Sequence, residues 1–306
     1  MSTILLATEK AFSKDAVERI KKVVENSSHR FQLLENYANK KDLLDAVKNA
    51  DALIVRSDIA DIEVFDAGKN LKIIVRAGAG YDNIDIKAAT EKNICIMNTP
   101  GQNANAVAEC CFGMMLYISR KHFDGSTGTE LRGKKLGIIG YGNIGRFMAQ
   151  ISKGFGMDVS AYKRNPDPVA MRIDGVSPSG SFEEIFETCD YVSLHIPAVA
   201  DTMGAINYSL LTRLPVGGTL INTARLEVVN EDDLIKIMEE RNDIKYVSDF
   251  MPKKADIFKE KFTNRWFAPA KKMGAQTEEA NVNAGIAAAR QIINFFDKGD
   301  TTFKVN

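Results

Sequence analysis

The chain has 306 residues, enough for one large or two medium domains with hydrophobic cores. Its 40 Lys and Arg balance 40 Asp and Glu, so the formal net charge is +0 and no broad basic surface for nucleic acid or membrane is expected. The four cysteines lack disulfide or metal-ligand spacing, and there is neither a secretory signal nor an apolar run of ~20 residues. We therefore expect a cytoplasmic protein with no membrane span and no metal site.

Residues 1 to 97 alternate short apolar strands with amphipathic helices. Strands are predicted at 4–7, 31–34, 52–55, 71–75 and 94–97, and helices at 15–25, 42–49 and 62–67. Turn residues at 98–101 separate this set from a long helix predicted at 104–120. Such alternation is typical of a parallel sheet with helices on both faces.

A second set of the same kind begins after residue 128. Strands are predicted at 136–139, 157–162, 191–195, 219–222, 246–248 and 266–268, and helices at 143–153, 231–239 and 278–296. The predicted fold class is therefore α/β, with two Rossmann-like, doubly wound parallel-sheet domains and a cleft between them. Ligands of such sheets bind beyond the carboxyl ends of the strands, so functional residues are sought there.

The most informative motif opens the second set. Gly140, Gly142 and Gly145 fit G-x-G-x-x-G between a predicted strand and a predicted helix. The first glycine permits the turn, the second leaves room for a pyrophosphate, and the third lets the helix pack closely on the strand. The helix N-terminus, at Asn143 and Ile144, would offer N–H groups to the phosphates. This context favours a dinucleotide site over a glycine-rich turn without a ligand.

The end of the next strand leaves the choice between NAD and NADP open. An NAD enzyme usually places an acidic residue there to bind the ribose 2′-OH. Here Lys163 and Arg164 follow Tyr162, and Asp167 is displaced along the chain. Two cations would suit the 2′-phosphate of NADP, whereas a solvated turn would not select it. We expect NAD, with NADP as the alternative.

Six motifs follow one another along the chain. They are R-A-G-A-G-Y-D at 76–82, N-T-P at 98–100, V-A-E at 107–109, the glycine motif, S-L-H-I-P at 193–197 and N-T-A-R at 222–225. Together they resemble the D-isomer-specific 2-hydroxyacid dehydrogenases, and most of all the short phosphoglycerate dehydrogenases that lack a regulatory domain. The resemblance implies an NAD(P)-dependent oxidoreductase. It also implies a substrate-binding domain at 1–97 and 276–306 and a nucleotide-binding domain at 98–275.

The resemblance further implies how a small phosphorylated hydroxy acid is bound. The backbone N–H groups of Ala79 and Gly80 would receive the substrate carboxylate, as an anion-binding nest does. Arg56 matches the arginine that phosphoglycerate dehydrogenases direct at the phosphate, and Arg76 adds charge nearby. Asp58 stands where a second basic residue often follows Arg56, which weakens the argument for a phosphate.

The same resemblance assigns residues to the nicotinamide nucleotide. Asp249 would accept a hydrogen bond from the nicotinamide carboxamide. The other residues would flank the cofactor, and they are His195, Pro197, Thr223 and Ala224.

The chain departs from the family at the acid/base. The family uses a histidine near the C-terminus, and Lys272 occupies that position here, as in a lysine variant of the short phosphoglycerate dehydrogenases. Lys272 would donate a proton in reduction, while Arg225 would grip the α-carboxylate and polarise the C2 oxygen. Burial and the charges of Arg225 and Lys271 would lower the pKa of Lys272. Asp256 is only a weak candidate for a carboxylate partner, and a solvated lysine pair beside an inactive site is the alternative.

The expected activity is D-3-phosphoglycerate dehydrogenase in L-serine biosynthesis, performed by a homodimer that pairs through the helix at 104–120. Two alternatives stay open. A glyoxylate or hydroxypyruvate reductase of the same family is favoured by Lys163, Arg164 and the lysine acid. A nucleotide-sensing binding protein on this fold is favoured by the missing histidine.

Overall fold

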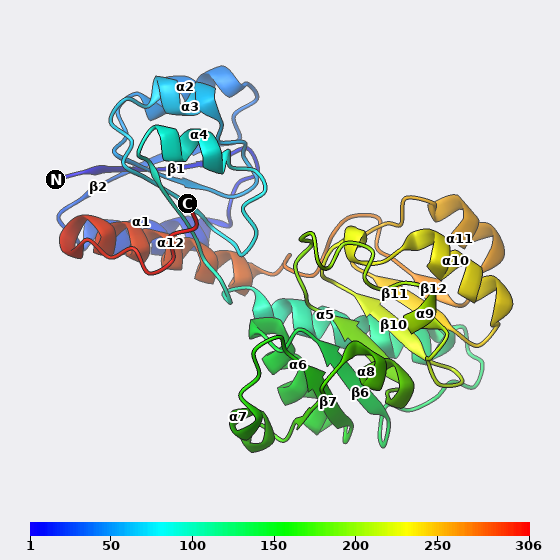
Figure 1. Ribbon diagram of the computed structural model, residues 1–306. Coiled ribbons are helices and arrows are strands. Elements are labelled where there is room, and N and C mark those ends of the chain that lie inside the picture. The colour runs from blue at the N-terminus through cyan, green and yellow to red at the C-terminus, as the bar shows by residue number, and fades with distance from the viewer. The chain divides into compact units, whose positions relative to one another are not determined.

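The computed structural model describes residues 1–306 as two compact units (Figure 1). The smaller unit comprises Met1–Asn103 and Gln276–Asn306, and the larger unit comprises Ala104–Ala275. The boundary expected from the sequence lies between Met97 and Asn98, and the structural division lies slightly further along the chain, after Asn103. No helix is long and apolar enough to cross a membrane.

The smaller unit is built on a five-stranded parallel sheet. Its strands are β1 (Thr3–Thr8), β2 (Arg30–Glu35), β3 (Ala52–Val55), β4 (Ile73–Arg76) and β5 (Cys95–Asn98), in the order β2-β1-β3-β4-β5. Its helices are α1 (Lys14–Glu25), α2 (Lys40–Val47), α3 (Ile62–Ala67), α4 (Ile86–Glu91) and α12 (Glu278–Lys298). Figure 1 shows α1 and α12 on one face of the sheet and α2, α3 and α4 on the other.

Strands β1, β3, β4 and β5 are almost wholly buried, as helices on both faces of a parallel sheet require, whereas β2 at the edge is partly exposed. Leu6 and Ile54 pack toward α1 and α12, whereas their neighbours Leu5 and Leu53 pack toward α2 and α3. Small residues on α12 permit the close approach to α1. At Gly285 a Cβ atom would lie 2.3 Å from the Cδ1 atom of Ile20, so the contact depends on the missing side chain.

The larger unit is built on a seven-stranded parallel sheet. Its strands are β6 (Lys135–Ile139), β7 (Asp158–Tyr162), β8 (Ser177–Pro178), β9 (Tyr191–Leu194), β10 (Thr219–Asn222), β11 (Lys245–Ser248) and β12 (Trp266–Phe267). Their order is β12-β11-β10-β9-β6-β7-β8, which reverses direction between β6 and β9. In a doubly wound sheet this reversal is the point where a dinucleotide crosses the strand ends.

Helices cover both faces of the larger sheet. One face carries α5 (Ala104–Ser119), α6 (Asn143–Gly154) and α7 (Pro168–Ile173). The other carries α8 (Phe182–Thr188), α9 (Tyr208–Leu211), α10 (Glu231–Glu240) and α11 (Ala255–Lys261). Two short 3-10 turns lie at Lys121–Phe123 and Leu226–Val228. The predicted fold class, two Rossmann-like parallel-sheet domains, is confirmed for each unit.

Several short elements are absent from the sequence analysis, namely β8, α4, α7, α8, α9 and α11. Helices of four to seven residues make too few turns to show a helical period. Four of them nevertheless begin at an N-cap whose side chain accepts a backbone N–H, and these caps are Asp85, Asp167, Ser181 and Asn207. Capping therefore defines these helices where periodicity does not.

Candidate active site

The glycines of the G-x-G-x-x-G motif join β6 to α6 at the reversal of the larger sheet. Gly140 has φ +102, and a Cβ atom there would lie 2.7 Å from the carbonyl oxygen of His195. At Gly145, which is buried, a Cβ atom would lie 2.8 Å from the carbonyl oxygen of Gly140. No heavy atom lies within 4 Å of a Cβ built at Gly142. The fold requires Gly140 and Gly145, whereas Gly142 leaves open space over the backbone.

The N-terminus of α6 faces that open space without a capping side chain. Its N-cap is Gly142, and no side-chain hydrogen bond closes the first turn at Asn143 and Ile144. Asn143 is exposed and Ile144 is half-buried. Unpaired N–H groups and the positive end of the helix dipole attract an anion. The loop and the helix end therefore fit the pyrophosphate of a dinucleotide.

The end of β7 carries the two cations that the sequence analysis assigns to the ribose corner. Lys163 is half-buried, and Arg164 reaches Asp201 with 3.5 Å between Nη2 and Oδ2. Both side chains of that pair are largely exposed, so the pair contributes little to stability. Asp167 caps α7, because its Oδ1 accepts the N–H of Ala170 at 3.0 Å. The carboxylate nearest the corner in sequence is thus engaged in starting a helix.

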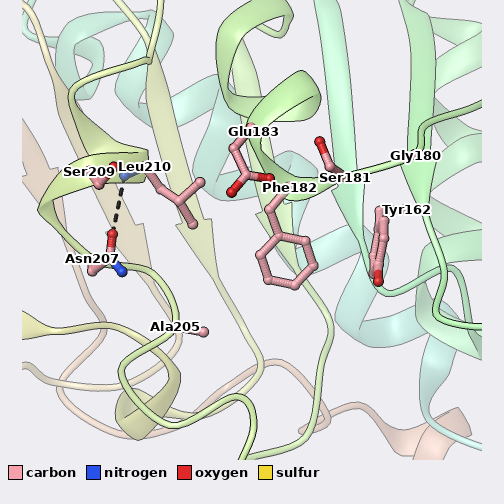
Figure 2. A pocket seen from close by; sticks show the side chains of 9 residues that line it. All are labelled: Tyr162, Gly180, Ser181, Phe182, Glu183, Ala205, Asn207, Ser209 and Leu210. Atoms are coloured by element: carbon pink, nitrogen blue, oxygen red, sulfur yellow. Dashed lines mark hydrogen bonds between the residues drawn. The ribbon is translucent and has the colours of Figure 1, made fainter.

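A pocket of about 390 Å³ opens beside the end of β7 (Figure 2). Tyr162 and Phe182 meet edge to face within it, with ring centroids 4.9 Å apart. Asn207 already accepts the backbone N–H of Leu210 at 3.2 Å, so its amide oxygen is engaged in capping α9. The lining residues are Tyr162, Gly180, Ser181, Phe182, Glu183, Ala205, Asn207, Ser209 and Leu210. Only Tyr162 is noted in the sequence analysis.

His195 connects the ends of β9 and β10. Its Nε2 lies 2.9 Å from Ser193 Oγ, and its Nδ1 lies 3.5 Å from Thr223 Oγ1. Thr223 Oγ1 also lies 3.4 Å from Cys111 Sγ on α5. Burial lowers the pKa of His195 to about 3, so the ring is neutral at physiological pH. Pro197 is exposed at the end of this segment, and its carbonyl accepts the Thr202 hydroxyl.

The turn that presents Arg225 is held by Asn222, the last residue of β10. Asn222 is fully buried, its Oδ1 accepts the N–H of Ala224 at 3.1 Å, and its Nδ2 donates to the Arg225 carbonyl at 2.9 Å. The guanidinium of Arg225 donates in turn to the Ala224 carbonyl at 2.9 Å. A buried side-chain amide therefore fixes the backbone from which Arg225 projects.

Asp249, directly after β11, has two differently engaged carboxylate oxygens. Its Oδ1 accepts the N–H groups of Met273 and Gly274 at 2.7 and 2.9 Å. Its Oδ2 is buried and has no hydrogen-bond partner within the protein. A buried acceptor without a donor is costly, so this oxygen fits an amide donor brought by a ligand. Asp249 also fixes the segment that follows Lys272.

The ammonium of Lys272 lies 4.8 Å from the ring centroid of Phe250. Lys272 is exposed, so the burial expected from the sequence is wrong, and the cation–π contact with the ring instead orients the ammonium. Phe250 is missing from the sequence analysis, where its only signal is that it follows Asp249. Asp256, the weak candidate for a carboxylate partner, has a side chain that is 99% exposed and pairs with Lys259 at 3.4 Å. Its contacts do not support that role.

In the smaller unit, Arg56 follows β3 and is half-buried. Its Nη2 donates to Gln276 Oε1 at 2.9 Å, and its guanidinium carbon lies 5.5 Å from the ring centroid of Phe12. Burial lowers the pKa of Arg56, but an arginine side chain stays charged at neutral pH. Asp58 is buried and accepts the hydroxyl of Tyr37 at 2.7 Å and the N–H of Arg56 at 3.2 Å. It anchors the loop and forms no ion pair with the guanidinium.

Arg76 and the loop behind it complete the smaller unit's strand ends. Arg76 Nε donates to the Arg56 carbonyl at 2.9 Å. A Cβ atom at Gly78 would lie 1.6 Å from Arg76 Nη1, so the glycine makes room for that side chain. The N–H groups of Ala79 and Gly80 donate to no acceptor within the protein, and the Ala79 carbonyl accepts from Asn98. The two amides are therefore available to an anion.

Comparisons with known proteins agree with this geometry. The family model of the D-isomer specific 2-hydroxyacid dehydrogenase NAD binding domain matches residues 103–269. The crystal structure of NAD⁺-bound 3-phosphoglycerate dehydrogenase in Entamoeba histolytica has a TM-score of 0.88 and 44% identity, and covers 100% of this chain and 98% of that one. Hydroxypyruvate reductase of Thermotoga maritima is 35% identical over 68% of this chain and 71% of that protein. D-3-phosphoglycerate dehydrogenase of Rattus norvegicus is 30% identical over 88% of this chain but only 53% of its own length.

Proposed function

The chain belongs to the D-isomer specific 2-hydroxyacid dehydrogenase family, and we propose that it acts as a D-3-phosphoglycerate dehydrogenase. The family makes it an oxidoreductase with NAD as cofactor. The open space over Gly142 and the unpaired Oδ2 of Asp249 fit that cofactor at its pyrophosphate and at its carboxamide. The proposed setting is L-serine biosynthesis in the cytoplasm. The smaller unit would bind the substrate and the larger unit the nucleotide.

The state of Arg56 carries the proposal of a phosphorylated substrate. Its guanidinium is half-buried, yet its hydrogen-bond acceptor within the protein is the neutral amide of Gln276 rather than a carboxylate. A partly desolvated cation that forms no ion pair within the protein favours binding of an anion. Arg76, whose Nε is bonded to the Arg56 backbone, adds a second guanidinium at the neighbouring strand end. Two guanidinium groups suit a phosphate dianion better than an uncharged hydroxymethyl group.

The proposed chemistry divides the substrate among the chain's own residues. The N–H groups of Ala79 and Gly80 bind the carboxylate, and Arg225 binds the carboxylate and the C2 oxygen. Lys272, as the neutral amine, takes the hydroxyl proton in oxidation, and as the ammonium it returns that proton in reduction. NAD, when bound, supplies the acceptor for the hydride that leaves C2. Asp249 holds the backbone after Lys272, so the amine is presented from a fixed segment.

A reductase acting on hydroxypyruvate or glyoxylate is the second candidate. Reduction needs a proton donor for the C2 oxygen, and an ammonium placed by the Phe250 ring can supply that proton. The similarity to the Thermotoga maritima hydroxypyruvate reductase supports the same candidate. The two candidates differ in what they require of Arg56.

A steady-state panel decides between them. The wild-type protein is assayed by absorbance of the reduced nicotinamide with 3-phosphoglycerate, phosphohydroxypyruvate, hydroxypyruvate and glyoxylate. The proposal requires kcat/KM to be highest for the phosphorylated pair. Arg56→Ala should lower kcat/KM for that pair by ~10- to 100-fold, which corresponds to the ~1.5–3 kcal/mol of a charge-assisted hydrogen bond. An equal loss with glyoxylate would assign Arg56 to a role unrelated to phosphate.

We further propose that two copies pair through α5. Gly113 lies in the interior of this helix, is exposed, and has no heavy atom within 4 Å of the position of a Cβ. Glycine there costs about 1 kcal/mol relative to alanine, and nothing within the chain requires it. The close approach of the α5 backbone of a second copy would require a glycine at this position. Sedimentation of Gly113→Leu against the wild type should show weakened association, and an unchanged oligomeric state would remove α5 from the interface.

A further inference from the structure

We propose that Gln276 is a positioning residue that makes Arg56 selective for a phosphate dianion. This inference deepens the proposed function and rests on it. The two residues are 220 positions apart in the sequence and meet only in the folded protein. Its basis is that the Arg56 guanidinium forms no ion pair and that the side chain which accepts its hydrogen bond is a neutral amide, while the only carboxylate acting on it is the nearby Asp58, which is bonded to other donors.

The backbone of Arg56 is fixed before its side chain is considered. Its N–H donates to Asp58 Oδ2 at 3.2 Å, and its carbonyl accepts from Arg76 Nε at 2.9 Å. Asp58 is buried and also accepts the N–H of Glu9 at 2.6 Å and the hydroxyl of Tyr37 at 2.7 Å. The only carboxylate next to Arg56 in the loop is thus engaged with other donors.

The guanidinium itself has two neighbours. Gln276 Oε1 accepts from Nη2 at 2.9 Å, and the ring of Phe12 lies 5.5 Å from the guanidinium carbon. A guanidinium has five N–H donors, and the amide uses one of them. The orientation of the side chain is therefore set while most of its donors stay available and no carboxylate forms an ion pair with it. This is the state in which a guanidinium binds two phosphate oxygens at once.

Gln276 is itself held in a defined place. It directly precedes Thr277, the N-cap of α12, whose Oγ1 accepts the N–H of Ala280 at 3.1 Å. It also follows Lys272 closely in the chain, so one short segment carries the proposed acid/base and the amide that orients the phosphate ligand. The side chain of Gln276 is exposed, so its replacement is not expected to disturb the core.

Gln276→Glu tests the role of charge with almost no change of shape. A carboxylate at the same place would pair with Arg56, neutralise it and repel the phosphate. We expect KM for 3-phosphoglycerate and phosphohydroxypyruvate to rise by ~10- to 100-fold while kcat stays within about threefold. For hydroxypyruvate and glyoxylate, kcat/KM should stay within about threefold of the wild type. A structural defect would instead lower kcat/KM for all four substrates.

Asn70→Asp is the matched control. It adds the same charge at an exposed position in the loop before β4. That loop lies at the amino ends of the parallel strands, whereas Arg56 follows the carboxyl end of β3. We expect its KM values for all four substrates to match those of the wild type. A rise of KM for the phosphorylated substrates in Asn70→Asp equal to that in Gln276→Glu would overturn the inference, because net charge would then explain the effect.

A double-mutant cycle tests whether Gln276 acts through Arg56. Gln276→Met removes the acceptor and keeps the length of the side chain. We expect it to raise KM for 3-phosphoglycerate by ~3- to 10-fold in the wild-type background and to have no effect when Arg56→Ala is present. Equal effects in both backgrounds would show that Gln276 acts independently of Arg56 and would overturn the inference.

Binding of inorganic phosphate separates failure of this inference from failure of the proposed function. Calorimetric titration with phosphate needs no turnover. Loss of binding in Arg56→Ala, with at least about tenfold weakening in Gln276→Glu, supports the inference even if the wild type proves inactive on phosphorylated substrates. That inactivity would overturn the proposed function alone. Phosphate affinity that is unchanged in both variants would overturn the inference.

Discussion

Replacing the glycines between β6 and α6 one at a time should separate folding from nucleotide binding. In Gly142→Ala the new methyl group enters open space, and the backbone at φ −101 and ψ −150 is one that alanine adopts. The free energy of unfolding should therefore stay unchanged or rise by ~0.4–1 kcal/mol, because alanine reduces the entropy of the unfolded chain. Affinity for NADH should nevertheless fall by at least about tenfold, since the methyl group occupies the space left for the pyrophosphate.

Replacing either of the other two glycines, Gly140 or Gly145, should instead lower the free energy of unfolding. In Gly145→Ala the methyl group would lie 2.8 Å from the Gly140 carbonyl oxygen and 3.0 Å from Ile138 Cγ2, inside the packed interface of helix and strand. Such overpacking costs about 1–3 kcal/mol. Gly140→Ala adds a left-handed backbone strain, at φ +102, to a 2.7 Å contact with the His195 carbonyl oxygen, so it should destabilise more than Gly145→Ala.

Two measurements on each variant suffice. Urea unfolding gives the free energy of unfolding, and NADH fluorescence titration gives the dissociation constant. Gly154→Ala is the control, because this glycine ends the same helix and also has open space around it. It should behave as the wild type or slightly more stably in both assays. If Gly142→Ala bound NADH as tightly as Gly154→Ala, the pyrophosphate would not lie over this loop and the assignment would fail.

Three further predictions address the strand ends of the larger unit. Lys272→Ala should lower kcat by ~10²–10⁴-fold with little change in NADH affinity, and a wild-type rate in the variant would remove Lys272 from the mechanism. Wild-type oxidation should accelerate as pH rises, because the base is the neutral amine. Asp249→Asn keeps an acceptor for the N–H groups at 273 and 274 but replaces the unpaired Oδ2, so NADH titration should show ~10-fold weaker binding while the melting temperature stays near that of the wild type. Burial lowers the pKa of His195 from the ordinary histidine value of 6.5 to about 3, so its contribution to the free energy of unfolding is complete above pH 6.5 and is lost as pH falls toward 3. Urea titrations between pH 4 and 7 should therefore show a shallower pH dependence for His195→Gln, and equal slopes would contradict the burial argument.

The sequence predicts the sheet well where strands are buried on both faces. Residues 52–55 form a continuous apolar run that is wholly buried, and residues 191–194 are buried throughout with Ser193 as the one polar member. The sequence does not predict β8, which has two residues at the edge of the sheet, one of them a proline. Two residues are too few to show the alternation of a strand, and a proline argues against a strand except at an edge.

Site residues on strand ends are predictable, whereas their hydrogen-bond partners are not. Arg56 and Asp249 follow apolar runs, so topology alone places them at the carboxyl edge of a sheet. Gln276, Phe12 and Phe250 acquire their contacts only through tertiary packing, and none has a local signal in the sequence. Asp58 shows the limit most clearly. In the sequence, an aspartate where a basic residue is often found weakens the argument for a phosphate. In the structure, the Asp58 carboxylate accepts hydrogen bonds from the Arg56 N–H and from the Tyr37 hydroxyl.

The distribution of charge after β3, β4 and β11 would let a chain of zero net charge favour the multiply anionic substrate that we propose. Its carboxylates there are engaged by internal donors: Asp58 receives backbone N–H groups and a hydroxyl, and Asp249 receives two backbone N–H groups on one oxygen. By contrast, the Arg56 guanidinium donates to a neutral amide, and the N–H groups of Ala79 and Gly80 have no acceptor within the protein. Selectivity then depends less on the number of cations than on what each cation is paired with. A single neutral acceptor at Gln276 is for that reason expected to matter more than any change of net charge elsewhere on the surface.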